Sequence, residues 1–175
     1  MRHYFQQCPV MIMTIGLAVA ILFFASPVAA INITVMGNIQ DWAFTPGTTN
    51  ENSTTLKLNV STESSSWHVN VKDALDNGKS SSSAGRLLEY NASTGWVNAG
   101  SVISNNMTVV GETIQNVQKS TATLGPTDQV IETGDAAASS KQMAITLQQL
   151  ITYTDRHLTN GNTYRVVITF TGVES

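Results

Sequence analysis

The residues best suited to catalysis or metal binding are few, and they are far apart in the sequence. Beyond residue 30 the histidines are His68 and His157. A zinc site needs several Cys, His or carboxylate ligands at short spacing, and neither histidine has such neighbours. The sequence also lacks the G-x-S-x-G, H-E-x-x-H and phosphate-loop motifs. We therefore predict no catalytic residues, no metal site and no cofactor, and we expect a protein that is not an enzyme.

Two acidic stretches are candidate calcium sites. "DALDNGK" contains Asp73, Asp76 and Asn77. A later stretch contains Asp128, Glu132 and Asp135. Neither has the D-x-D-x-D-G spacing of a dedicated calcium loop. Because Asp and Asn in turns usually cap their own backbone, we expect these residues to shape turns without binding calcium.

Three tryptophans could form a platform that stacks on sugars. Trp67 shares its alternation phase with Val69 and Val71, which predicts a core position. Trp42 lies in "DWAFTPG", which indicates the end of a strand, and Trp96 follows a turn glycine. Carbohydrate binding is therefore an alternative function and not the first choice.

N-glycosylation sites are typical of cell-surface proteins, and the sequence contains several candidates. The pattern N-x-S/T occurs at five positions, about as often as the high Ser, Thr and Asn content produces by chance. The candidate sites are Asn32, Asn52, Asn59, Asn91 and Asn106.

The first 30 residues have the pattern of a secretory signal peptide. A basic start is followed by an apolar run from Val10 to Ala25, and Ser26-Pro27-Val28-Ala29-Ala30 suits cleavage after Ala30. The alternative is a retained anchor, but the apolar run has about 16 residues where a membrane span needs roughly 20. We predict a signal peptide over 1–30 and one domain over 31–175, secreted and not membrane-bound. Cleavage removes Cys8, so packing or neighbouring copies must hold a cysteine-free domain.

The charge content excludes several classes of partner. Charged residues make up 12% of the chain, against about a quarter in typical proteins. Removing Arg2 leaves eight basic and twelve acidic residues. Without a basic patch, we expect no nucleic-acid partner and no anionic lipid partner.

Alternating β-branched residues dominate the domain. "INITVMG", "LKLNVST" and "WHVNVKD" alternate apolar and polar residues with the period of half-buried strands. Shorter candidates are "GWVNAG", "MTVVG", "TIQNVQ" and "QVIETG", while "PGTTNENSTT" and "NGKSSSSAG" suggest loops. Helical signals are short. The pattern predicts an all-β fold with a single antiparallel β-sandwich-like domain.

The two longest strand patterns come last. "QMAITLQQLITYTD" and "TYRVVITFTG" flank Asn160-Gly161, which predicts a β-hairpin. The final strand has high β-propensity, no proline and one charge, which is typical of segments that pair with copies of themselves. The sequence leaves open whether this strand is at an edge or central. The candidate assembly residues are Tyr164, Val166, Val167, Ile168, Thr169 and Phe170.

Several phrases together resemble a known class of surface protein. "DWAFTPGTTNENSTTLKLNVST", "WHVNVKDALDNGK", "MTVVGETI", "QVIETG" and "QLITYTD" with "GNTYRVVITFTG" are similar to the small secreted β-rich surface proteins of methanogenic archaea, including major sheath proteins. The resemblance implies a structural protein that assembles with copies of itself, by strand pairing along the final hairpin and the first strand, into an extracellular sheath or filament. In a donated-strand variant, Ile31 to Gly37 would be the donor. The alternative is a secreted monomeric adhesin or carbohydrate-binding module, acting on glycans or other surface proteins.

Overall fold

The computed structural model describes residues 30–39, 42–97, 99–159 and 161–175. The predicted signal peptide lies outside these residues, apart from Ala30. The described residues form twelve strands and two short 3-10 helices, η1 (Asp76–Gly78) and η2 (Ser81–Ser83). None of these helices is long and apolar enough to cross a membrane. The strands are β1 (Asn32–Met36), β2 (Thr48–Thr62), β3 (Trp67–Asp73), β4 (Leu88–Asn91), β5 (Gly95–Trp96), β6 (Thr108–Val110), β7 (Val117–Lys119), β8 (Thr121–Thr123), β9 (Gln129–Gly134), β10 (Ala138–Ile151), β11 (Thr163–Arg165) and β12 (Ile168–Glu174).

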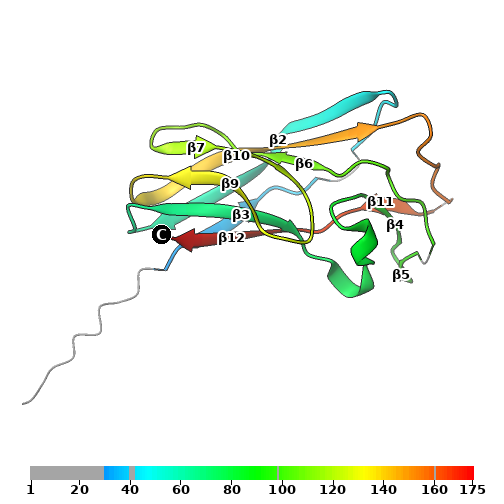
Figure 1. The fold of residues 1–175 in the computed structure, drawn as a ribbon, viewed down its shortest axis with the longest axis horizontal. Helices are drawn as coiled ribbons and strands as arrows, with labels where there is room; N and C mark the ends of the chain where they lie inside the picture. Colours follow the sequence, from blue (N-terminus) through cyan, green and yellow to red (C-terminus); the bar gives the residue numbers. More distant parts are fainter. Residues whose placement is uncertain (1–29, 40–41, 98, 160) are drawn as a thin grey trace, which may run out of the picture.

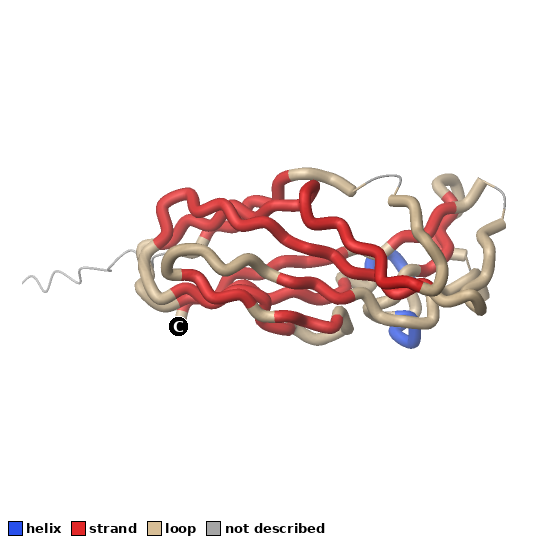
Figure 2. The backbone as a smooth tube through the Cα atoms, turned by 90° about the horizontal axis from the view of Figure 1, so that it is seen from above, coloured by secondary structure: helices blue, strands red, loops and turns tan. Residues whose placement is uncertain are grey.

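The strands form three antiparallel sheets. Their orders are β1-β2-β10-β6-β8, β12-β3-β9-β7 and β11-β4-β5. The first two sheets pack as two layers along the long axis, and the small third sheet lies at one end (Figures 1 and 2). This arrangement confirms the predicted all-β, β-sandwich-like fold.

The core lies between the two large sheets and follows the alternation of the sequence. Trp67, Val69 and Val71 on β3 are fully buried, as their shared phase predicts. Their partners across the layer come from the other long strands, where apolar residues again alternate with exposed ones. The main inward residues of those strands are Leu56, Leu58, Val60, Met143, Ile145 and Leu147.

The predicted C-terminal hairpin is wrong. β10 pairs with β2 and β6, whereas β11 pairs with β4 and β12 pairs with β3. The chain between β10 and β11 is a long connection, in which the Asp155 carboxylate accepts hydrogen bonds from Thr152 N (2.7 Å) and Ser104 N (2.8 Å). Asn160 lies outside the described residues.

The predicted loop over residues 46–55 is also largely wrong, for a related reason. β2 begins at Thr48 and pairs with the end of β10, from Thr48 opposite Ile151 to Asn52 opposite Leu147. Its first half is polar because this part of the ladder projects beyond the core (Figure 1). Pairing with a long partner, not burial, makes this segment a strand.

Candidate functional site: the open edge of the sandwich

The last strand segments form one continuous line with a single pairing side. In antiparallel strands, alternate residues direct both backbone groups to the same side. Val167 O accepts a hydrogen bond from Ala74 N (2.8 Å), and Ser175 N donates to Ser66 O (2.9 Å). The backbone N–H and C=O groups of the odd-numbered residues of β12 therefore point toward β3.

The same parity holds in β11. Glu89 of β4 bonds through its backbone to Ser101 and Val97, on the side away from β11. The backbone groups of its neighbours Leu88 and Tyr90 therefore point toward β11, where these residues lie opposite Arg165 and Thr163. Odd residues again face the partner, so the register continues across both sheets.

The consequence is a long unpaired backbone edge, which we call the open edge (Thr163–Glu174). Its outward N–H and C=O groups have no hydrogen-bond partner among the described residues. Arg165 and Glu174 are its only charges, although natural edge strands are usually protected by charges, prolines or bulges. The outward residues are Tyr164, Val166, Ile168, Phe170, Gly172 and Glu174.

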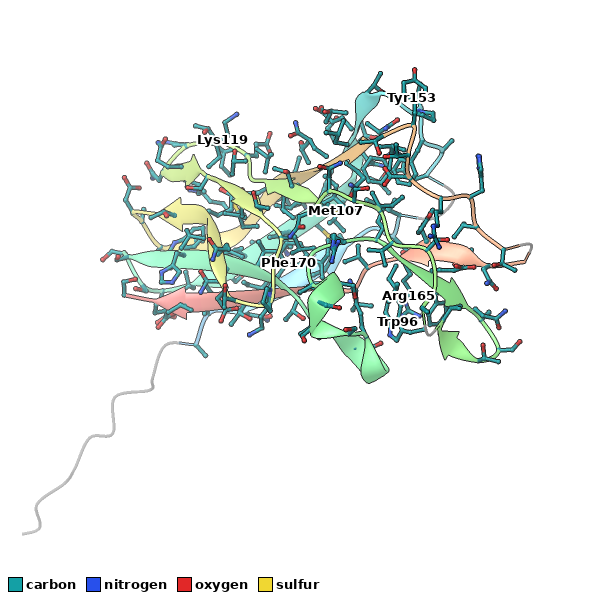
Figure 3. All side chains as sticks on the ribbon, turned by 45° about the vertical axis from the view of Figure 1, so that its right-hand side comes forward. Trp96, Met107, Lys119, Tyr153, Arg165 and Phe170 are labelled. Carbon is teal, nitrogen blue, oxygen red and sulfur yellow. The ribbon has the colours of Figure 1, made fainter. Side chains whose placement is uncertain are left out.

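A large apolar hollow borders this edge. Its volume is about 830 Å³, and it lies between the open edge and residues from two parts of the chain before β2, 35–39 and 42–44. Four residues of the open edge whose backbone groups point outward also line this hollow with side chains that pack against the core: Tyr164, Val166, Ile168 and Phe170. The rest of the lining is mainly apolar, and includes Trp42, Phe44, Leu56, Leu87, Met107, Leu147 and Leu158. Met107 and Phe170 are labelled in Figure 3.

β1 covers only the far end of the open edge. A Cβ placed on Gly172 would lie 2.8 Å from the terminal methyls of both Ile31 and Ile33, so these side chains sit directly over that glycine. Figure 1 shows the start of the described chain close to the C-terminus. Val35, further along β1, is 47% exposed and lines the hollow.

A buried carboxylate anchors the beginning of the open edge. Glu89 accepts hydrogen bonds from Asn162 Nδ2 (2.7 Å), Ser101 N (2.8 Å) and Thr159 N (3.0 Å). These hydrogen bonds lower the pKa of Glu89 to about 2, and the bond from Asn162 has the largest effect. The ionised side chain thus fixes the connection that leads into β11.

The three tryptophans do not form a common platform. Trp67 is fully buried and donates a hydrogen bond to Ala136 O (2.8 Å). Trp42 packs on Phe44 (4.9 Å between ring centroids) beside the hollow. The Trp96 ring already has two cations of this chain over it, Lys79 Nζ at 5.5 Å and Arg165 Cζ at 5.8 Å. Figure 3 shows Arg165 and Trp96 close together at the end of the molecule.

The acidic stretches and histidines also remain apart. Asp73 is buried and accepts hydrogen bonds from Lys79 Nζ (2.5 Å) and Gly85 N (2.7 Å). Burial lowers the pKa of Lys79 despite this ion pair. His68 lies 3.3 Å from Ser175 Oγ, and His157 is exposed. No metal-ligating group of three His, Cys, Asp or Glu residues occurs within the described ranges.

Sequence reasoning missed the role of Glu132. It is fully buried, and its Oε1 accepts a hydrogen bond from Glu112 N (2.6 Å). Burial raises its pKa from 4.5 to about 8. Alternation along the strand provided no signal for this burial, because a register shift between β3 and β9 buries both Ile131 and Glu132.

The five candidate glycosylation asparagines differ in how far their side chains are engaged. Asn91 and Asn106 donate hydrogen bonds from Nδ2, to Asn162 Oδ1 and to Ala84 O and Leu124 O. Asn52 and Asn59 accept hydrogen bonds through Oδ1. Asn32 is exposed on β1.

Comparisons with protein-family models, curated proteins and solved structures found no match.

Proposed function

We propose that this protein is a structural extracellular protein, which self-assembles through β-strand pairing at the open edge into a cell-surface sheath or filament. The observation that carries the proposal is the unpaired backbone edge of twelve residues, Thr163 to Glu174. The predicted signal peptide and the resemblance to secreted archaeal surface proteins point to the same role.

Strand addition by a neighbouring copy would satisfy the outward backbone groups of this edge. Main-chain hydrogen bonds supply affinity in this mode of association, and alternate side chains supply specificity. The edge has high β-propensity and little charge, so neither proline nor repulsion opposes pairing. A polymer joined in this way would also compensate for the absence of disulfides.

The apolar hollow favours one alternative function. Trp42, Phe44, Tyr164 and Phe170 line it, and concave apolar sites of this size hold small ligands in other proteins. A secreted monomer that binds glycans or another surface protein would use these aromatic residues. This alternative predicts saturable ligand binding by a protein that stays monomeric.

The test is assembly of residues 31–175 over a concentration series, followed by negative-stain electron microscopy and sedimentation. The edge variant carries Thr169→Lys and Thr171→Lys, which add charge on the solvent face of β12. The matched control carries Thr121→Lys and Thr123→Lys on exposed positions of β8, on the opposite side of the sandwich. We expect regular fibres from the parent and the control, and folded monomers from the edge variant. A parent that stays monomeric at every concentration would contradict the proposal.

A further inference from the structure

We propose that the hollow beside the open edge is the seat of β1 from a second copy, so that each subunit donates its first strand to the next. This inference rests on the proposed function and names the segment that fills the site.

The hollow is a groove that is open to solvent and lined mainly by apolar side chains. Here about 830 Å³ of mostly apolar space lies directly beside unpaired backbone groups of residues 164–170. An extended strand would meet both needs at once, because its backbone would pair with the edge and its alternate side chains would enter the hollow.

β1 is the strand of this chain best able to leave its place. It pairs through one side only, over five residues from Asn32 opposite Ser61 to Met36 opposite Lys57. It lies at the predicted mature N-terminus, so it can be withdrawn without unthreading any other strand. Withdrawal breaks no contact inside the layer of β2, β10 and β6.

β1 also has the side chains that the hollow requires. Ile31, Ile33 and Val35 alternate with polar residues, which places three β-branched side chains on one face of an extended strand. The present position of β1 borders the hollow, because Val35 of β1 and the following Gly37 line it. Donation would therefore uncover Gly172 and join the two into a single slot along the open edge.

The test locks β1 in its own subunit. Thr34 and Asn59 are opposite each other on β1 and β2, and side chains so paired are near enough for a disulfide after small shifts. The protein over residues 31–175 has no other cysteine, so the Thr34→Cys and Asn59→Cys variant can form one disulfide. The matched control, Asn70→Cys with Thr171→Cys, locks β3 to β12, a pair that need not separate.

We expect the oxidised β1 lock to lose fibre formation and to regain it on reduction, while the control forms fibres in both states. Fibres from the oxidised β1 lock would overturn strand donation and leave edge pairing intact. Absence of fibres from the parent would instead refute the proposed function.

A competing peptide covers the case in which the reduced variant assembles poorly. The peptide INITVMG, identical to Ile31–Gly37, should slow fibre growth of the parent by occupying the hollow. The control peptide, with Ile31→Ser, Ile33→Ser and Val35→Ser, should leave growth unchanged. Equal growth with either peptide would overturn the inference.

Discussion

Two strand segments of this molecule pass from one sheet to another, and their surroundings differ. On one side of the sandwich, Val117–Thr123 pairs first with β9 and then with β6. Ser120 makes the change, because its N–H donates to Ile131 O (2.7 Å) and its carbonyl accepts from Gly111 N (3.1 Å). On the other side, the open edge also serves two sheets, but it pairs in one direction throughout.

The comparison separates two ways to end a β-sandwich. The first segment ties the two large sheets together and places Lys119 outside (Figure 3). The open edge does not tie the two large sheets together, and the hollow lies beside it. β7 and β8 are also edge strands, but the apolar hollow borders the open edge. The open edge therefore offers an added strand both backbone partners and apolar contacts.

The largest expected effect concerns Glu132 of β9, which lies on the side of the sandwich that Val117–Thr123 ties together and that we call the closed side. Because its folded-state pKa is about 8 instead of 4.5, the folded protein keeps a proton that the unfolded chain releases. The stability that this neutral carboxyl provides is complete below pH 4.5, and is lost as the pH rises to 8. We expect the free energy of unfolding to fall by about 5 kcal/mol over this range.

Urea unfolding at several pH values measures this effect. Glu132→Gln cannot ionise and keeps an acceptor for Glu112 N, so the difference between the two proteins isolates this carboxyl from other titrating groups. Parallel pH profiles for both proteins would show that Glu132 is ionised in the fold.

The next effect tests how tightly the closed side is packed. A Cβ on Gly111 would lie 2.3 Å from the carbonyl oxygen of Ile131, so backbone must move. We expect Gly111→Ala to cost about 3 kcal/mol of unfolding free energy. Gly125→Ala is the matched control, since nothing lies within 4 Å of its Cβ position, and it should stay within about 0.5 kcal/mol of the parent. Equal melting temperatures for the two variants would contradict tight packing around Gly111.

A smaller, local effect is expected at the beginning of the open edge. Glu89→Gln weakens the charge-assisted hydrogen bonds that hold Thr159 and Asn162. We expect faster trypsin cleavage after the exposed Arg156, with little change in global unfolding. The control is Glu63→Gln, a substitution at an exposed position before β3. Unchanged cleavage at Arg156 would show that other contacts hold this connection.

The sequence predicts strands with strong alternation well, and predicts their partners poorly. "WHVNVKD" becomes β3 because apolar residues at period two bury one face. "QVIETG" becomes β9, but its burial does not alternate, because a register shift against β3 buries both Ile131 and Glu132. The hairpin prediction failed because Asn160-Gly161 favours a reversal locally, whereas the pairing of β10 is decided by the distant β2. A ladder whose partners are 76 to 103 residues apart in sequence leaves no local signal.

The candidate site was predictable in part, for the same reason. Alternation places Tyr164, Val166, Ile168 and Phe170 on one face, but whether a strand is paired on one side or two depends on the whole topology. Glu132 shows the opposite limit, since an acidic residue in a turn-rich stretch is expected in solvent, and its burial depends on Gly111 leaving room.

The smallest perturbation is replacement of amide hydrogen by deuterium, and it resolves the comparison residue by residue. In the monomer, amides of the outward residues Val166, Ile168 and Phe170 should exchange rapidly, while those of Thr169 and Thr171 are protected by β3. In fibres, strand addition should protect the outward set as well, because their N–H groups then have partners. Amides of Thr121 and Thr123 serve as the internal reference and should change little between the two states. Outward amides that stay fast in fibres would place the assembly contact elsewhere on the molecule, since a strand cannot be added to this edge without bonding them.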